Sequence, residues 1–217
     1  MTEFTSDDAA DLWSVAERMA DAARAVILPH FRSVGLAADN KLAGGFDPVT
    51  IADRAAETAM RDLLADLRPD DGILGEEHGS VSGTSGLTWV LDPIDGTRSF
   101  ISGTPTWGVL IALSDDTGPI MGMIDQPYVG ERFMGGLGRC NWTGPGRANP
   151  LGTKSTTTLS DAILFTTFPE IGSEDQRTAF QKVAREVKLT RYGCDCYAYA
   201  LLAAGQIDLV IEDGLNA

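Results

Sequence analysis

The chain has 217 residues, 43% of them hydrophobic, and its 17 Lys and Arg against 31 Asp and Glu give a net charge of −14. This apolar content is too high for a disordered chain, and the length allows one large or two small domains. No apolar run reaches the roughly 18 residues of a membrane-spanning helix. An acidic chain without clustered Lys or Arg is also a poor nucleic-acid binder, because phosphate neutralisation needs such clusters.

The N-terminus and the cysteines indicate where the protein works. The first residues, MTEFTSDDAADLW, are acidic and lack the basic and apolar segments of a secretory signal. Cys140, Cys194 and Cys196 form an odd set without CxxC spacing, which fits reduced thiols better than disulfides or a zinc site. We therefore expect a cytoplasmic protein.

Two amphipathic helices are expected first along the chain. Apolar residues recur at helical spacing from Ser6 to Pro29, with acidic residues between them. Thr50 can cap a second helix that carries Asp53 in its first turn and ends before Pro69. Asp53 is thus expected near a helix N-terminus.

Acidic residues follow two short buried strands. Residues 72–75 read as a strand that ends at Glu76 and Glu77, and residues 79–86 read as a Gly- and Ser-rich mobile loop. Residues 88–91 read as a second strand that ends at Asp92. The turn 93–96 and a helical start at Thr97 follow. We expect the two acidic clusters to meet at adjacent strand ends.

The remaining pattern divides the chain into two halves. Residues 107–113 and 120–124 predict an antiparallel hairpin, followed by a strand at 131–134. Beyond the Gly-, Pro- and Asn-rich stretch 135–152, strands and helices alternate; they are expected at 163–167, 174–187, 194–204 and 207–211. This predicts an α+β domain over 1–145 and an α/β domain over 146–217.

The carboxylates suggest a site for hard metal ions. Glu76 and Glu77 at one strand end, and Asp92 and Asp95 across a Pro-containing turn, could converge on Mg²⁺, which prefers oxygen ligands. A pair of such cations can activate water for phosphate-ester hydrolysis. Each of these features also has an ordinary interpretation. Residues 92–96 could form a surface turn, Glu76 and Glu77 could be a solvated acidic pair, and Asp53 could be a charge that complements a helix dipole. Their ordered combination favours the metal site.

Three motifs in register resemble the inositol-monophosphatase superfamily of Mg²⁺-dependent phosphatases. They are DPVTIAD at 47–53, GEE at 75–77 and WVLDPIDGTRSF at 89–100. Within that superfamily the segments GTPTWG at 103–108 and DCYAYA at 195–200 are similar to bacterial histidinol-phosphate phosphatases of this fold. The resemblance implies a layered αβαβα sugar-phosphatase fold and a homodimer.

The resemblance also implies a ligand set for two or three Mg²⁺ ions. Glu76, Asp92 and the Ile94 carbonyl are expected to bind the first ion, and Asp92 and Asp95 the second. Glu76 is further expected to help hold a third ion or the attacking water. The residues of the turn thus carry most of the metal ligands.

Catalysis and phosphate binding are implied for neighbouring residues. Asp53 and Thr97 are expected to orient and deprotonate the attacking water. The amides of Gly96 and Thr97, at a helix start, are expected to hold the phosphate. Lys41 aligns with a family lysine that gates the site or approaches the phosphate, and a solvated loop charge is an equal alternative.

Substrate selection is expected in the second half. Asp195 stands where inositol-specific members carry a small residue, and Glu212 matches a substrate-contacting acid of the family. Two acids suit a substrate with an amine and an imidazole, as L-histidinol phosphate has, which would place the enzyme in histidine biosynthesis. For Asp195, a helix cap is an almost equal alternative. Inositol phosphates and other sugar or nucleotide phosphates remain alternative substrates.

The end of the chain departs from the family pattern. Family members continue past residues 211–217 into an aromatic-Asp pair that completes the second metal site. We expect the chain to be a truncated product or to work with fewer ligands. The alternative from another class is therefore an inactive metal- or ligand-binding fragment.

Overall fold

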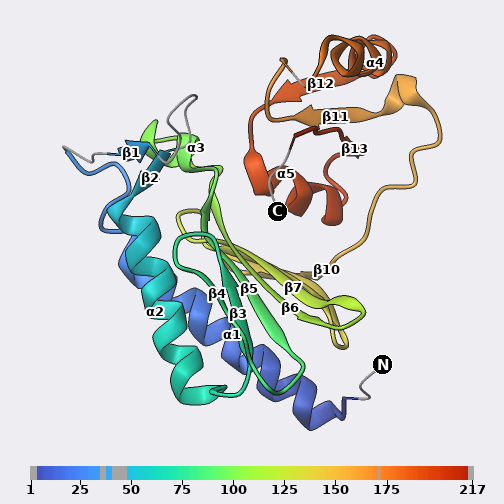
Figure 1. The fold of residues 1–217 in the computed structure, drawn as a ribbon. Helices are drawn as coiled ribbons and strands as arrows, with labels where there is room; N and C mark the ends of the chain where they lie inside the picture. Colours follow the sequence, from blue (N-terminus) through green and yellow to red (C-terminus); the bar gives the residue numbers. More distant parts are fainter. Residues whose placement is uncertain (1–3, 35–37, 41–47, 171, 215–217) are drawn as a thin grey trace.

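A mixed eight-stranded sheet organises the first part of the chain (Figure 1). The computed structural model describes residues 4–34, 38–40, 48–170 and 172–214. In spatial order the strands are β10 (Arg147–Pro150), β9 (Arg139–Gly144), β8 (Glu131–Gly136), β7 (Gly118–Gln126), β6 (Gly108–Asp115), β5 (Thr88–Asp95), β3 (Gly72–Gly75) and β4 (Gly79–Val81). The expected hairpin is confirmed, since β6 pairs antiparallel with β7.

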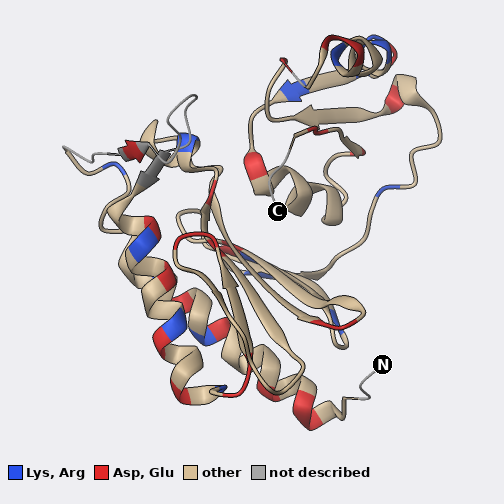
Figure 2. Ribbon diagram, in the orientation of Figure 1, with Lys and Arg blue, Asp and Glu red and all other residues tan. Residues whose placement is uncertain are grey.

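Helices α1 (Ser6–Ile27) and α2 (Ile51–Leu67) pack together over one face of this sheet (Figure 1). Each begins with a capping box, formed by Thr5 with Asp8 in α1 and by Thr50 with Asp53 in α2. Such reciprocal bonds satisfy amide groups that a helix N-terminus leaves unpaired. Charged residues lie along the outward sides of both helices (Figure 2). None of the helices in the described residues has the length and apolar character to cross a bilayer.

The two acid-bearing strands are neighbours and run parallel. β3 pairs with β5 so that Gly75 lies opposite Leu91, and the Glu76 amide donates to the Leu91 carbonyl at 3.2 Å. Parallel strands end at the same edge of a sheet. Glu76 and Asp92 come directly after the paired residues Gly75 and Leu91, so they lie next to each other at that edge. The expectation that the two acidic clusters meet at adjacent strand ends is confirmed.

A second, three-stranded sheet contains β12 (Leu189–Tyr192), β11 (Ile163–Thr166) and β13 (Leu209–Val210), all parallel. Successive residues of β11 face opposite sides. Leu164 packs with α4 (Glu174–Ala184), and Phe165 packs with α5 (Asp195–Ala203). Helix α5 also contacts β7 of the large sheet. The layers are therefore helix, sheet, helix, sheet, helix, which confirms the αβαβα fold.

Several predicted boundaries were wrong. The loop expected at 79–86 begins with strand β4, which pairs antiparallel with β3. All of β4 is exposed, so this edge strand lacks the apolar alternation that would have identified it. The helix expected to reach residue 187 ends at Ala184, and only Leu209–Val210 of the last expected strand forms a ladder. Two short strands also pair ahead of α2, β1 (Ala38–Asn40) with β2 (Pro48–Thr50).

The stretch expected to link the two halves contains a hairpin. β10 pairs antiparallel with β9, so the large sheet continues past residue 145. Residues 151–158 then run without helix or strand to a 3₁₀ turn at Leu159–Asp161. We therefore propose that the boundary between the two domains lies within 151–158 rather than at 145.

Candidate active site

The acids at the edge of the large sheet line a cavity of about 240 Å³. Its lining comes from the ends of β3 and β5, from the short helix α3 (Thr97–Ile101), from the loop after β11 and from the start of α5. The lining residues are Glu76, Asp92, Asp95, Gly96, Thr97, Arg98, Phe168 and Asp195. Residues far apart in the sequence thus converge, and four of the eight carry carboxylates.

A bulge in β5 sets the spacing of its two aspartates. Asp92 lies opposite Leu110 and Asp95 lies opposite Gly108, so β5 has one residue more than β6 in this interval. Pro93 lacks an amide hydrogen and cannot continue the ladder, which explains why the bulge forms here. The bulge brings both aspartates into the lining of the same cavity.

The electrostatics of Asp92 fit a cation. Burial, followed by repulsion from Glu76 and Asp95, raises the pKa of Asp92 well above its ordinary value. Its Oδ1 atom is enclosed and receives no hydrogen bond from the described residues. Among the described residues, no group of three or more His, Cys, Asp or Glu side chains has the arrangement of a metal site. The donors fit Mg²⁺, which takes a few carboxylates and keeps several waters.

Asp53 is buried in the first turn of α2. It is 1% exposed, and its Oδ2 accepts hydrogen bonds from the Thr50 amide at 2.8 Å and from the Thr50 hydroxyl at 2.5 Å. Burial raises the pKa of Asp53 to about 6, although the bonds from Thr50 oppose this rise. No hydrogen bond joins Asp53 to Thr97 within the described residues. The Thr97 hydroxyl instead donates to the Ile94 carbonyl at 3.2 Å.

Two observations explain why a glycine is needed at position 96. The φ of Gly96, 85°, lies in the left-handed region, where a side chain is strained. A Cβ at this position would also lie 2.7 Å from the Asp195 carboxylate carbon. The turn that starts α3 therefore needs a glycine for Asp195 to approach it.

Asp195 reaches the cavity from the first turn of α5. Its Oδ2 accepts from the Ser99 hydroxyl at 2.5 Å and from the Thr106 hydroxyl at 3.4 Å, and no described residue donates to its Oδ1. Asp195 does not act as a side-chain helix cap, because the N-cap is Cys194 and no side chain caps the helix. The Asp95 carboxylate instead accepts the Cys196 amide at 2.6 Å, so a cavity residue anchors α5.

Asp53, Glu77, Ile94 and Glu212 were also expected at the site, but they are not among the described residues that line this cavity. Glu212 accepts from the amide and hydroxyl of Thr167, at 2.7 and 2.8 Å, and lines a separate cavity beside α4. Lys41 lies outside the described residues. The roles expected for Glu212 and Lys41 stay predictions.

Two lining residues were not expected from the sequence. The guanidinium carbon of Arg98 lies 5.1 Å from the ring centre of Phe168. Phe168 comes two residues after the end of β11. Arg98 stood inside the quoted DGTRSF motif, and Phe168 is an exposed aromatic residue next to a strand end. Phe168 lies on a loop, where an exposed aromatic side chain favours a binding role.

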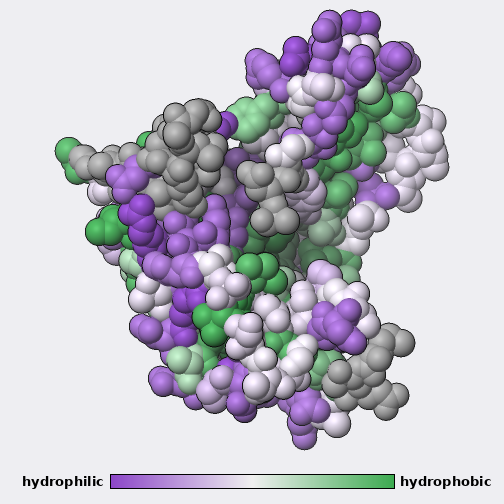
Figure 3. Space-filling model, viewed as in Figure 1, coloured by the Kyte–Doolittle hydropathy of each residue, from purple (hydrophilic) through white to green (hydrophobic). Residues whose placement is uncertain are grey.

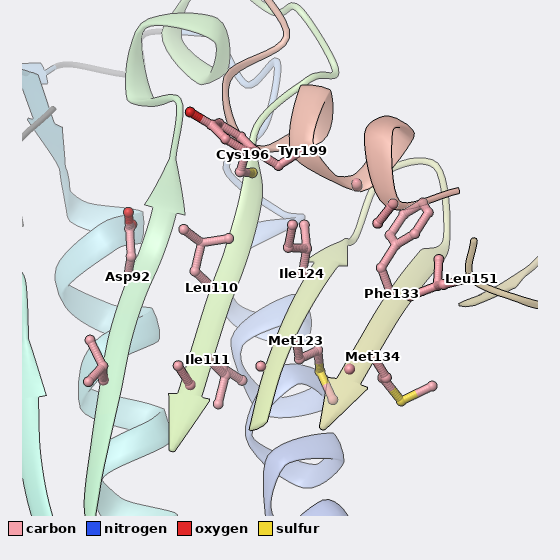
Figure 4. Close-up of a pocket in the computed structure, with 16 residues that line it drawn as sticks. Asp92, Leu110, Ile111, Met123, Ile124, Phe133, Met134, Leu151, Cys196 and Tyr199 are labelled. Atoms are coloured by element: carbon pink, nitrogen blue, oxygen red, sulfur yellow. The ribbon is translucent and has the colours of Figure 1, made fainter. Parts of the chain in front are cut away.

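A larger cavity of about 610 Å³ lies between the open face of the sheet and α5. Figure 4 shows Cys196 and Tyr199 of α5 above Leu110 and Ile124 of the sheet. Hydrophobic residues gather around the hollow between the two parts of the molecule (Figure 3). The lining is almost entirely apolar, so the smaller cavity, where the titratable groups converge, is the candidate active site.

Comparisons with known proteins agree with this geometry. The model of the inositol monophosphatase family matches residues 8–217. The chain is 44% identical to the chloroplastic bifunctional phosphatase IMPL2 of Arabidopsis thaliana over 94% of this chain and 58% of that protein. It is 34% identical to the histidinol-phosphatase of Streptomyces coelicolor over 93% of this chain and 77% of that protein.

Solved structures show the same fold. An inositol monophosphatase from Zymomonas mobilis superimposes with a TM-score of 0.81 at 41% identity, over 95% of this chain and 78% of that one. The chain thus spans 58% of the length of the plant relative and about three quarters of the two bacterial proteins. On these matches, the chain belongs to the inositol monophosphatase family of metal-dependent phosphatases.

Proposed function

We propose that the protein hydrolyses a phosphate monoester of a small molecule with the help of Mg²⁺, and that its preferred substrate is L-histidinol phosphate. The observation that carries this proposal is the meeting of Glu76, Asp92 and Asp95 with Asp195 in one cavity. The first three form an all-oxygen donor set. Asp195 adds a negative charge beside it, where the organic part of a substrate can bind.

The metal ligands of the proposal are the residues of the two strand ends. Glu76, Asp92 and the Ile94 carbonyl would hold one ion, and Asp92 with Asp95 would hold a second. Mg²⁺ bound there would neutralise phosphate charge and make a water molecule more acidic. The enclosed, unpartnered Oδ1 of Asp92 supports this assignment, because a buried charge needs a partner.

Proton transfer is assigned to Asp53. A carboxylate with a pKa of about 6 can accept a proton from water near neutral pH much better than an ordinary aspartate, whose pKa is 3.8. Thr50 holds this carboxylate in one orientation through two hydrogen bonds. The amides of Gly96 and Thr97, at the start of α3, would hold the phosphate next to the acids.

Asp195 supports histidinol phosphate over inositol phosphate. Both of its hydrogen bonds go to Oδ2, so Oδ1 is left to pair with an ammonium or imidazolium group of the substrate. A neutral polyol would make no ion pair there. The similarity to the inositol monophosphatase from Zymomonas mobilis favours inositol monophosphate as the second candidate substrate.

A substrate panel tests the proposal. Phosphate release is measured with L-histidinol phosphate, inositol 1-phosphate and a sugar bisphosphate, each with Mg²⁺ and with EDTA. We expect Mg²⁺-dependent release that is fastest with histidinol phosphate. Faster release from inositol phosphate would favour the second candidate. If Mg²⁺ binds without release from any substrate, the protein is a binding fragment and the proposed activity is wrong.

A further inference from the structure

One face of α2 carries three charged residues a helical turn apart. Asp53, Glu57 and Arg61 follow at i, i+4 and i+8, so they lie in a row along the helix. Asp53 lies near enough to Asp92 of the candidate site to contribute to the rise of its pKa, and the other two contact the loop between β3 and β4. That loop carries Glu76. One face of α2 thus carries the expected base, Asp53, and contacts the loop that carries the expected metal ligand Glu76.

Glu57 holds this loop by its backbone. Its side chain is fully buried, its Oε2 accepts the Glu77 amide at 2.6 Å, and its Oε1 accepts the His78 amide at 3.2 Å. Arg61 donates from Nε to the same Oε1 at 2.7 Å and from Nη2 to the Gly79 carbonyl. The two amides directly after Glu76 are therefore bound to a buried carboxylate.

The preceding residue shows how closely Glu57 approaches the strand end. A Cβ built on Gly75 would lie 2.0 Å from the Glu57 Oε1 atom and 2.7 Å from the Arg61 Nη2 atom. Any other residue at 75 would push the carboxylate away from the loop. Since the Glu76 amide is itself bound to the Leu91 carbonyl, the backbone is held on both sides of Glu76.

We infer that Glu57 is a positioning residue, which holds the loop after β3 so that Glu76 faces Asp92 across the metal site. This inference rests on the proposed function. Glu57 touches neither metal nor substrate in this assignment. It acts through two amides, both of which need an acceptor, and residues that orient metal ligands in this way commonly change metal affinity by about 10- to 100-fold when replaced.

The test compares Mg²⁺ binding by Glu57→Gln and the unmodified chain, measured by titration calorimetry without substrate. A glutamine keeps the size of the side chain but presents an NH₂ group to one of the donors, so the loop loses an acceptor. We expect Mg²⁺ affinity to fall about 10-fold or more. Arg61→Gln removes the support of Glu57 and the bond to the Gly79 carbonyl but leaves the acceptor of both loop amides in place, so we expect a smaller fall in the same direction.

Asp125→Asn is the matched control. Asp125 is also fully buried and bound by arginines, with Arg24 at 2.8 Å and Arg132 at 2.7 Å, but it lies on β7 and is not a lining residue of the cavity. The Asp125→Asn substitution should lower the melting temperature and leave the Mg²⁺ affinity of the protein unchanged. This control separates loss of a buried ion pair from loss of loop position.

Each outcome has a distinct meaning. If the unmodified chain binds no Mg²⁺, both the proposed function and this inference are wrong. If it binds Mg²⁺ and Glu57→Gln binds equally well, only the positioning role is wrong. Where Glu57→Gln fails to fold, Arg61→Gln decides in the same way, because unchanged affinity there contradicts the inference.

Discussion

Replacing Asp53 by asparagine should make the protein more stable at alkaline pH while it removes the proposed base. Asp53 is 1% exposed and burial raises its pKa to about 6, whereas an unfolded aspartate titrates near 3.8. The folded state therefore binds the proton more tightly than the unfolded state. Stability falls as the pH rises from about 4 to about 6, since folding must then bury a charge.

The size of this effect follows from the two pKa values. The difference between 3.8 and about 6 corresponds to about 3 kcal/mol of free energy of unfolding. Asparagine has nearly the same shape and can still accept both bonds from Thr50 through its carbonyl oxygen. We expect Asp53→Asn to gain about 2–3 kcal/mol at pH 8, which raises the melting temperature by about 4–12 °C for a chain of this length.

Calorimetric melting at pH 8 and pH 4, in EDTA, measures the effect. The stabilisation should be present at pH 8 and absent at pH 4, where Asp53 is protonated in the folded state. Asp8→Asn is the control, because Asp8 makes the same capping box with Thr5 in α1 but is exposed. Its hydrogen bonds lower the pKa of Asp8, so this variant should lose stability at pH 8 and lose less as the pH falls. If both variants change stability in the same direction at pH 8, the reasoning from burial is refuted.

The sequence was sufficient for those parts of the site that depend on local pattern. Short apolar strands that end in Glu76 and Asp92 predicted a shared sheet edge, and β3 and β5 pair in parallel as this requires. The capping motif of Thr50 and Asp53 predicted where α2 begins. In each case the strand or helix period and a few turn residues contained the information.

Other parts depend on contacts between distant residues. The role inferred for Glu57 requires the loop after β3 to fold back over α2, and these residues are 20 or more positions apart. Strands β4 and β10 are exposed along their whole length, so no apolar alternation marked them. Glu212 points to Thr166 and Thr167 because β11 and β13 are neighbours, which only the sheet order reveals.

Three further substitutions test the site and its support. Asp92→Asn should abolish Mg²⁺-dependent hydrolysis while far-ultraviolet circular dichroism stays unchanged, because Asp92 is the carboxylate assigned to both ions; an unchanged rate would contradict the ligand assignment. Tyr197→Phe removes the hydroxyl that donates to Glu131 and connects α5 to β8. It should lower the free energy of unfolding by about 1 kcal/mol and the melting temperature by about 2–4 °C. Asp195→Asn keeps the shape of the side chain near Ser99 but removes its charge. Since loss of a desolvated charge pair costs about 2 kcal/mol or more, KM for histidinol phosphate should rise about 30-fold, while KM for inositol 1-phosphate should change less than about twofold. Steady-state kinetics with both esters measure this difference, and an equal rise in both KM values would mean that Asp195 shapes the turn at Gly96 without pairing with the substrate.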